Sequence, residues 1–388
     1  MQVRAKPKVA FYLPGFFMGG AERHTLQLCA GLSARGFETL LLAHGGHVAE
    51  GLRDAADGEG VRVLGLRGMT SLRSWVMAYK AFRAADADII VAVNEAMAIR
   101  AVLLRALGAT RAKLVCTFHS TLLLPADERR LPLFRLAVRW LDTLVFVSRN
   151  QMAHWRGRRL RTPTAVAIPN GVDLERFDGG EPRAIAKQRL GLKPEDYVVG
   201  VLASFRPEKN HELLLRAARR LIETGVDLKL LFVGDGPRRR AIEALVQQLE
   251  LTGRVIFAGE HADVRPVIAA FDVGVICSSG VETFSLAALE VLASGAPMVM
   301  SDIGGASEIV TPGENGFLFE NGDIAGLTES LATLADPEVR ARLQAQARPS
   351  VERYDLANMI EAYDHLLCGL LQAGNASDRA GAALASAP

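Results

Sequence analysis

The stretch "YVVGVLASFRPEKNHELLLRAARRLIETGVDLKLLFVG" (residues 197–234) contains one complete repeat of a pattern that runs along the whole chain. An apolar run (197–204) is followed by a longer amphipathic segment and by a second apolar run (228–234). Apolar runs that alternate with amphipathic helices are typical of βα units around a parallel sheet. The pattern therefore predicts an α/β protein.

The apolar runs form two series. The first occupies residues 8–13, 38–43, 61–66, 88–93, 112–118 and 143–148. The second occupies residues 197–204, 228–234, 254–259, 273–279, 297–302 and 316–320. A chain of 388 residues with 49% hydrophobic content can fill two cores. We predict two doubly wound, Rossmann-like domains, with ligands bound in a cleft at the carboxyl ends of the strands.

The domain limits follow from breaks in periodicity. The Pro-, Asn- and Gly-rich segment "AIPNGVDLERFDGGEPR" interrupts every pattern. We therefore expect an N-terminal domain over 1–170, a linker over 171–183 and a C-terminal domain over 184–350. A helix is expected over 351–373, and the small Ala-, Gly- and Ser-rich residues 374–388 predict a disordered tail.

Composition favours a cytoplasmic protein. The four cysteines are far apart in sequence and form no CxxC pair, which argues for a reducing compartment and against a cysteine metal site. No apolar run approaches the roughly 20 residues that span a bilayer. The short apolar run near the N-terminus is broken by Pro14 and Gly15, so we interpret it as a first strand rather than a signal peptide.

The net charge of +2 conceals an asymmetry. Residues 1–170 contain 24 Lys and Arg against 12 Asp and Glu, and the remaining residues contain 21 against 31. This split predicts that the N-terminal half faces an anionic partner. A membrane surface and a nucleic acid both fit the charge, but the few scattered aromatics lack the stacking set of an RNA-binding domain, so nucleic acid is disfavoured.

Cations follow the strand at 197–204. Arg206 and Lys209 lie at the entry to a helix, where the helix dipole normally disfavours positive charge. One explanation is a solvated loop in which Glu208 is the ion-pair partner. The other explanation is a clamp for a phosphate group. We favour it, because two cations at a helix end that disfavours positive charge indicate a binding role.

Two other strand ends carry candidate residues. His119 follows the run at 112–118, where it would point into the cleft, although a lone histidine is more often structural than functional. Gly19 and Gly20 precede an amphipathic helix, where bare backbone lets a polar or anionic ligand approach. Either feature alone is weak.

Two carboxylates, Glu282 and Glu290, flank the start of an apolar helix in "VETFSLAALE" (281–290). They could simply complement the helix N-terminus and occupy its solvated face. With Thr283 as the N-cap and the helix starting near Phe284, they would instead border free backbone N–H groups. Backbone amides would bind a phosphate group, and the carboxylates would bind vicinal hydroxyl groups. Together they predict a pocket for a nucleotide sugar.

With these residues, the chain resembles the retaining glycosyltransferases of family 4, which have the GT-B fold of two Rossmann-like domains. The most specific match is the pair Glu282 and Glu290 followed by "LASGAPMVMSDIGGASEIVTPGENGFLF" (292–319). "GGAE", "IPNGVD", "RPEKN" and "VGDGP" occur in the family's order. The resemblance implies a C-terminal helix that crosses back to the N-terminal domain.

The resemblance also implies roles for single residues. Catalytic or leaving-group contacts would come from His119, Arg206, Lys209 and Glu282. Donor contacts would come from Gly19, Gly20, Gly234, Phe284, Ser285, Leu286 and Glu290. Among these, Glu290 would hold the ribose and Glu282 the hydroxyls of the transferred sugar. Many members carry an arginine five residues before the lysine, where this chain has Ser204, so Arg206 matches the pattern less well than Lys209 does.

The family implies metal-independent transfer from a nucleoside-diphosphate sugar, without a cofactor. UDP is favoured over GDP by its frequency in the family. Asp86 and Asp88 are the nearest approach to a DxD metal motif, but they precede a buried strand and are interpreted as a cap and a turn. Cations and helix amides would stabilise the leaving diphosphate.

The acceptor is expected on the N-terminal side. "RRLPLFRLAVRWLDTL" (129–144) and "HWRGRRLRTP" (154–163) combine arginines with apolar residues, as an interfacial helix does. A core-facing helix with solvated arginines is the alternative. Peripheral docking on an anionic membrane, at its inner face, would favour a lipid-linked or lipopolysaccharide-type glycan acceptor in cell-surface polysaccharide synthesis.

Two other functions remain open. A catalytically silent subunit that binds a nucleotide sugar would fit the displaced arginine. A nucleotide-sugar epimerase with the same fold is the nearest enzymatic alternative, although Glu282, Glu290 and "GGASEIV" favour transfer. Sequence does not fix the oligomeric state.

Overall fold

The computed structural model of the chain describes residues 6–16, 19–48, 60–66, 71–121, 128–280 and 282–385, with side chains up to residue 373. The chain divides into two compact units. Unit 1 comprises residues 1–169 and 357–388, and unit 2 comprises residues 170–356. Both are α/β, which confirms the predicted fold class.

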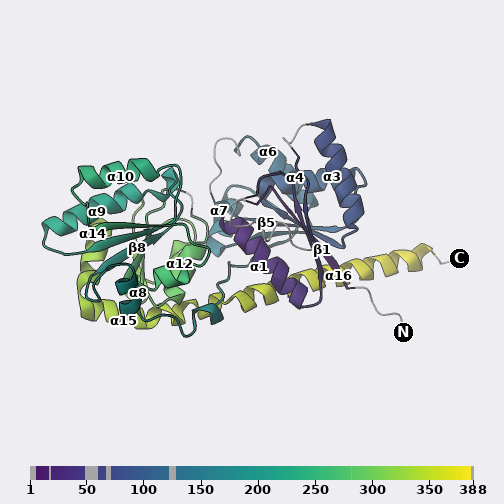
Figure 1. Ribbon diagram of the computed structural model, residues 1–388. Coiled ribbons are helices and arrows are strands. Elements are labelled where there is room, and N and C mark those ends of the chain that lie inside the picture. The colour runs from purple at the N-terminus through teal and green to yellow at the C-terminus, as the bar shows by residue number, and fades with distance from the viewer. Residues whose placement is uncertain are drawn as a thin grey trace. The chain divides into compact units, whose positions relative to one another are not determined.

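Unit 1 contains a seven-stranded parallel sheet in the order β3-β2-β1-β4-β5-β6-β7. Figure 1 labels β1 and β5 of this sheet among the helices of the unit. Its strands are β1 (Lys8–Leu13), β2 (Glu38–Ala43), β3 (Val61–Val63), β4 (Ile89–Val93), β5 (Lys113–Phe118), β6 (Thr143–Phe146) and β7 (Ala165–Ala167). Its helices are α1 (Gly20–Ala34), α3 (Leu72–Ala85), α4 (Asn94–Ala106), α6 (Leu131–Ala137), the short 3-10 helix η2 (Val138–Trp140), α7 (Arg149–Gly157) and α16 (Leu356–Ala385).

Unit 2 contains a six-stranded parallel sheet in the order β10-β9-β8-β11-β12-β13. Its strands are β8 (Val198–Leu202), β9 (Lys229–Val233), β10 (Val255–Gly259), β11 (Val273–Ile276), β12 (Met298–Ser301) and β13 (Gly316–Phe319). Its helices are η3 (Glu175–Phe177), α8 (Arg183–Arg189), η4 (Pro207–Lys209), α9 (His211–Glu223), α10 (Arg239–Gln248), α11 (Arg265–Ile268), α12 (Leu286–Ala293), α13 (Ala306–Ile309), α14 (Ile324–Ala335), α15 (Pro337–Ala347) and η5 (Pro349–Tyr354).

All twelve predicted strands are present, most of them shortened at one or both ends. The sequence missed β7, which has only three residues, all half-buried. A strand of three residues is too short to show a periodicity in the sequence. Its extended conformation is stabilised by pairing with β6.

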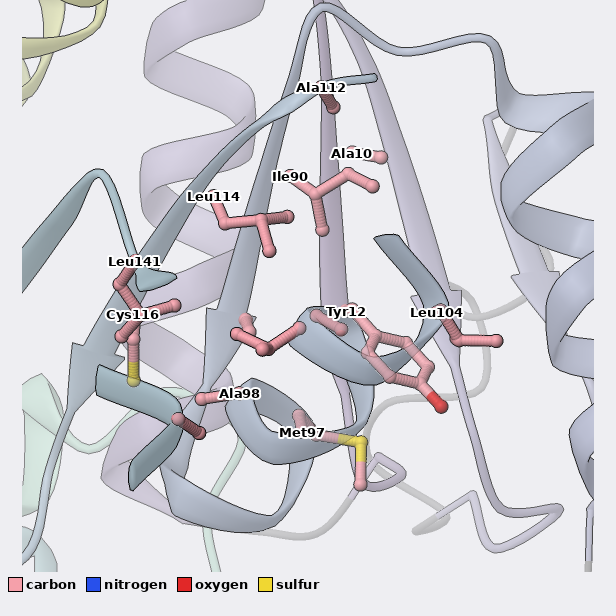
Figure 2. Close-up of a cluster of buried hydrophobic side chains, with 14 of the residues drawn as sticks. Ala10, Tyr12, Ile90, Met97, Ala98, Leu104, Ala112, Leu114, Cys116 and Leu141 are labelled. Atoms are coloured by element: carbon pink, nitrogen blue, oxygen red, sulfur yellow. The ribbon is translucent and has the colours of Figure 1, made fainter. Parts of the chain in front are cut away.

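The core of unit 1 lies between the sheet and its helices. Figure 2 shows Ala10 and Tyr12 of β1, Ile90 of β4 and Leu114 of β5 in one cluster with side chains of α4. These residues alternate along their strands, so one face of each strand contributes to the cluster. No described helix is both long and apolar enough to cross a membrane.

In unit 2, α9 shows why the amphipathic pattern folds onto the sheet. Its apolar positions Leu214, Ala217, Ala218 and Leu221 are almost fully buried. They recur at the helical spacing and pack with the strands in one cluster.

The ends of the predicted domains differ from the two units. Residues 171–183, expected as a linker, belong to unit 2, where Val172 pairs with Asp355 in a β-bridge. Unit 1 also contains the chain from residue 357 onward, so α16 returns to it, as the resemblance implied.

The backbone of α16 continues to Ala385, past residue 373, where the expected helix ends. Alanine has the highest helix propensity, and this segment is rich in alanine. Nearer its start, α16 packs on α1, where a Cβ at Gly31 would lie 2.2 Å from Ile360 Cδ1. The missing side chain therefore lets the two helices approach.

Each sheet has one point at which the strand order reverses. In unit 1 this point lies between β1 and β4, and in unit 2 it lies between β8 and β11. The loops that leave two such neighbouring strands diverge, and the crevice between them is where doubly wound sheets bind ligands. The candidate residues should therefore lie on these loops.

Candidate active site

Three polar side chains meet at the switch point of unit 2. Lys209 follows β8, whereas Ser278 and Glu282 follow β11. Lys209 Nζ lies 2.7 Å from Glu282 Oε2, and Ser278 Oγ donates to the same oxygen at 2.7 Å. Lys209 Nζ is also 3.4 Å from Ser278 Oγ. One carboxylate oxygen therefore receives both a cation and a hydroxyl.

Backbone contacts fix this cluster from three sides. The Ser279 amide donates to the Glu208 carbonyl at 2.8 Å, which joins the β11 loop to η4. Ser301 Oγ, at the end of β12, donates to the Ser278 carbonyl at 2.7 Å. A Cβ at Gly304 would lie 1.6 Å from the Glu282 carbonyl oxygen, so only glycine fits there, with a φ of +59°.

Lys209 and Arg206 have different surroundings. Arg206 is paired with Glu208 at 3.7 Å and its side chain is 49% exposed, whereas the side chain of Lys209 is 24% exposed. The expected Glu208 partner therefore belongs to Arg206, and Lys209 points to Glu282 instead. A left-handed residue, Asn210 with a φ of +45°, ends η4 and begins α9.

The N-terminus of α12 starts two residues later than predicted. Ser285, not Thr283, is the N-cap, and its side chain accepts a hydrogen bond from the Ala288 amide. Leu286, not Phe284, is the first helical residue. Thr283 precedes the turn and does not have the cap position, since the chain is still extended at Ser285 (φ −77°, ψ 112°).

Phe284 is held by unit 2 itself. Its carbonyl accepts a hydrogen bond from Asn170 Nδ2 at 2.9 Å, and its ring packs edge-on against Tyr354 with centroids 5.1 Å apart. The residue that begins unit 2 thus fixes the approach to α12. Asn170 belongs to the "IPNGVD" motif, so the sequence did contain a signal for it.

Glu290 lies inside α12 and is 8% exposed. The alternative that Glu290 occupies the solvated face of the helix is therefore wrong. A carboxylate that is this buried in an apolar helix needs a polar partner or a ligand to offset its desolvation.

In unit 1, His119 lies at the end of β5 beside residues from two helices. Its amide donates to Asn94 Oδ1 at 2.9 Å, and its ring contacts His24 edge-on at 4.9 Å between centroids. His24 Nε2 is 3.3 Å from the Tyr363 hydroxyl, which is also 3.3 Å from Thr117 Oγ1. The C-terminal helix thus reaches the surroundings of His119.

Burial, aided by the neighbouring His24, holds the pKa of His119 well below its usual range. The imidazole is therefore neutral near pH 7. Its Nε2 is buried and has no hydrogen-bond partner among the described residues. A ring nitrogen of a neutral imidazole can donate a hydrogen bond to a hydroxyl group or accept one from it, depending on the tautomer.

Gly19 and Gly20 form the start of α1, with Gly19 as an extended N-cap. A Cβ at Gly19 would lie 2.6 Å from Glu22 Oε2, so this carboxylate folds back over the helix N-terminus. An anion that approaches here would have to displace it. At Gly234, glycine is required by the packing of the backbone, since a Cβ there would lie 2.2 Å from the Ala203 carbonyl oxygen.

The structure therefore groups the candidates in two sets. Lys209 and Glu282 contact each other in unit 2, and Glu282 is close in sequence to the N-terminus of α12. His119 lies in unit 1. Sequence reasoning missed Ser278, Asn94, His24 and Tyr363. Ser278 had a signal, since "CSSG" follows a strand, whereas Tyr363 is 339 residues from His24 and had none.

Asp86 and Asp88 have the structural roles that were expected. Asp86 is the left-handed C-cap of α3, and Asp88 Oδ2 accepts the Lys8 amide at 2.8 Å. Within the described ranges, no three His, Cys, Asp or Glu side chains are grouped so that they could hold a metal ion. The four cysteines are free thiols.

Two family models match the chain. Residues 18–176 match Glycosyltransferase Family 4, and residues 182–349 match Glycosyl transferases group 1. The matches follow one another and together cover most of both units. The chain belongs to the family 4 glycosyltransferases. This confirms the family that the sequence motifs indicated.

Curated relatives of this family 4 protein include enzymes of several pathways. It is 28% identical over 279 residues to N-acetyl-alpha-D-glucosaminyl L-malate synthase of Bacillus anthracis, which covers 71% of this chain and 72% of the relative. It is 27% identical over 260 residues to the lipopolysaccharide core biosynthesis mannosyltransferase LpsB of Rhizobium meliloti, which covers 65% of this chain and 70% of the relative.

Among solved structures, HepE of Anabaena in complex with UDP superposes with a TM-score of 0.81 at 21% identity, over 93% of this chain and 100% of that chain. Sucrose-phosphate synthase of Thermosynechococcus elongatus gives a TM-score of 0.79 at 22% identity, over 95% and 100%. At these identities the similarity shows the fold, which is GT-B.

Proposed function

We propose that this family 4 glycosyltransferase moves a sugar from a nucleoside-diphosphate sugar to a glycan or lipid-linked acceptor, with retention of anomeric configuration. The observation that carries the proposal is the contact of Lys209 with Glu282 and Ser278 at the switch point of unit 2. A cation and a carboxylate that lie side by side support this proposal, because a leaving phosphate needs a cation and a transferred sugar needs a hydrogen-bond acceptor.

In this proposal Lys209 neutralises the departing diphosphate, with Arg206 as the second cation. The backbone amides of Phe284, Ser285 and Leu286 complete the phosphate site. The Ala288 amide is already bonded to Ser285 Oγ, so the amides before it are the ones left for a ligand. The dipole of α12 and the Lys209 ammonium would then both stabilise the negative charge of the diphosphate.

Glu282 and Glu290 take the hydroxyl groups of the donor. Glu282 would accept hydrogen bonds from the transferred sugar, and Glu290 from the ribose. Gly19, Gly20 and Gly234 are proposed as further donor contacts, made through the backbone. At Gly19 the donor would have to displace the Glu22 carboxylate. His119, neutral at pH 7, would contact the transferred sugar.

The transfer step is proposed as a front-face reaction without a metal or a cofactor. The acceptor oxygen forms a bond to the anomeric carbon on the side from which the β-phosphate oxygen departs. The proton of the acceptor hydroxyl passes to that phosphate oxygen, so the products are the glycoside and the nucleoside diphosphate. The chain's part is to stabilise the charge that develops on the leaving group.

UDP is the proposed donor nucleotide. It is supported by HepE of Anabaena, whose structures contain UDP and UDP-glucose. A relative from Corynebacterium glutamicum is named as GDP-mannose-dependent, so GDP is the competing base. Relatives named as a lipopolysaccharide core biosynthesis mannosyltransferase and as a phosphatidyl-myo-inositol mannosyltransferase support a glycan or lipid acceptor. We propose that this acceptor is reached from the cytoplasmic face of the membrane.

A thermal-shift panel with UDP, GDP, ADP, CMP and NAD tests the donor assignment, because a ligand that binds only the native state raises the melting temperature. We expect one nucleoside diphosphate to stabilise the protein. Glu290→Ala should abolish that shift, and the exposed Glu314→Ala in the same unit should retain it. If NAD or no nucleotide stabilises the wild type, the donor site is assigned wrongly.

A catalytically silent nucleotide-sugar subunit is the second candidate, and one observation favours it. The position five residues before Lys209, where many members carry an arginine, is Ser204, and Arg206 is paired with Glu208 and 49% exposed. Such a subunit would pass the thermal-shift test and yet release no nucleoside diphosphate from its donor. Measurement of UDP release in the presence of acceptor extracts separates the two.

A further inference from the structure

The helix α6 and the 3-10 turn η2 have two apolar faces. Phe134, Ala137 and Val138 are buried in the core of unit 1. Leu133, Leu136 and Trp140 are 58%, 47% and 53% exposed. A helix that only covers a core has one apolar stripe and a polar outer face. The second stripe therefore serves no packing purpose within unit 1.

Two further exposed leucines lie at the end of α4. Leu103 and Leu107, one turn apart, are 46% and 64% exposed. Between them, Arg105 donates to the Trp140 carbonyl and pairs with Asp142 at 2.7 Å, so the end of α4 lies beside η2. The α4–α6 face is defined here as Leu103, Leu107, Leu133, Leu136 and Trp140. Nine of the ten large hydrophobic side chains that are exposed within the described ranges belong to unit 1.

The surroundings of the α4–α6 face are strongly basic. Residues 128–161 contain nine arginines against two acidic residues, Glu128 and Asp142. Asp142 is already paired with Arg105 and Lys113. Burial raises the pKa of this carboxyl, but the hydrogen bond from the Leu114 amide and the two cations outweigh burial and lower it. Arg135 donates to the Arg158 carbonyl at 2.9 Å, which brings the arginines at the end of α7 next to α6.

We propose that the α4–α6 face docks this protein on an anionic lipid bilayer, with Leu133, Leu136 and Trp140 in the interface and the arginines on lipid phosphates. Apolar side chains flanked by arginine are what an interfacial helix presents to a membrane. Tryptophan favours the headgroup level. The proposal goes beyond the proposed sugar transfer and does not depend on it.

Charge and composition favour a bilayer over other occupants. A second copy of the chain in a two-fold contact would place the same arginines opposite one another, which is repulsive. A nucleic acid would satisfy the arginines, but it would leave the four exposed leucines in water. An anionic bilayer satisfies both groups of side chains.

Flotation of the full chain with vesicles tests the proposal. We expect recovery with phosphatidylcholine–phosphatidylglycerol vesicles, much less with phosphatidylcholine alone, and less again at high salt, since salt screens the arginines. The variant L133S/L136S/W140S should lower the apparent affinity by about tenfold or more, because it removes the apolar contact. R139Q/R156Q/R161Q, at exposed positions, should lower it comparably.

The matched control is L72S/V76S/M77S on α3, which changes three exposed apolar residues of the same unit outside the α4–α6 face. It should bind as the wild type does. If it loses as much binding as L133S/L136S/W140S, or if the latter binds normally, the assignment of this face is overturned.

Fluorescence gives an independent readout. Trp140 is the exposed tryptophan, whereas Trp155 is fully buried and Trp75 is stacked on Arg100. A blue shift on vesicle binding that disappears in Trp140→Phe, with binding retained, supports insertion of Trp140. The same binding in Lys209→Ala separates docking from catalysis. A dimer in sedimentation that L133S/L136S/W140S converts to a monomer would show a self-interface and overturn the bilayer proposal.

Discussion

Lys209 Nζ lies 2.7 Å from Glu282 Oε2, although 73 residues separate them in sequence. The contact arises because β8 and β11 are neighbours at the point where the sheet reverses its order. Ser278 donates to the same carboxylate oxygen at 2.7 Å, so the pair is held in place and partly shielded from water. A donor phosphate that binds here would compete with Glu282 for the ammonium.

Replacement of Lys209 by alanine should lower kcat by about 10²–10³-fold, because a preorganised charge on the leaving group is lost. The melting temperature should change little, since the side chain is partly exposed. The measurement is UDP release under saturating donor. Lys193→Ala, at an exposed lysine of the same unit, should leave kcat unchanged, and a normal rate for Lys209→Ala would remove Lys209 from the mechanism.

Replacement of Glu282 by glutamine keeps the shape of the side chain and removes its charge. We expect nucleoside-diphosphate binding to be retained, because Lys209 is then released for phosphate. Transfer should fall by roughly tenfold or more, since one ionic hydrogen-bond acceptor for the sugar is lost. Calorimetric titration with UDP and a transfer assay compare the two effects. Loss of UDP binding with a normal transfer rate would reverse the assignment.

Gly304→Ala should destabilise the protein by about 2 kcal/mol or more and also lower activity, since the new Cβ would collide with the Glu282 carbonyl. The matched control is Gly313→Ala, at a φ of +80° with open space around it, which should show only the conformational strain of about 1 kcal/mol. Denaturant titration and the transfer rate are the readouts. Equal effects of both substitutions would mean that Gly304 does not position Glu282.

Acid should destabilise the fold through His211. Burial lowers the pKa of this histidine to about 4, whereas the unfolded chain has the ordinary value of about 6.5. As the pH falls from 6.5 to 4, the unfolded state binds a proton that the folded state does not. Stability is therefore complete above 6.5 and falls below it, by up to about 3 kcal/mol.

Denaturant titrations of wild type and His211→Phe between these pH values measure this effect. The variant should show a flatter dependence, with the remaining slope due partly to His119, whose pKa is also lowered. His261→Phe, at an exposed histidine, serves as the control. An identical slope in His211→Phe and wild type would contradict the prediction.

The sequence predicted the alternation of strands and helices because this information is local. Each apolar run has its own length and composition, and α9 shows its buried positions at helical spacing. The motif containing Glu282 and Glu290 could be recognised for the same reason, since nine consecutive positions of one segment carry it. The exact start of α12 could not, because Ser285 and Thr283 are both good caps and the surrounding loop decides between them.

Tertiary structure alone decided which residues meet. Gly304 contacts the Glu282 backbone, Asn170 holds Phe284, and Tyr363 reaches His24 across 339 residues. These contacts depend on strand order and on the return of α16 to unit 1. Local periodicity encodes where a strand lies in the sequence and which of its faces is buried. It does not encode which strand pairs with it, since all parallel strands of a doubly wound sheet are similarly apolar and offer the same kind of edge.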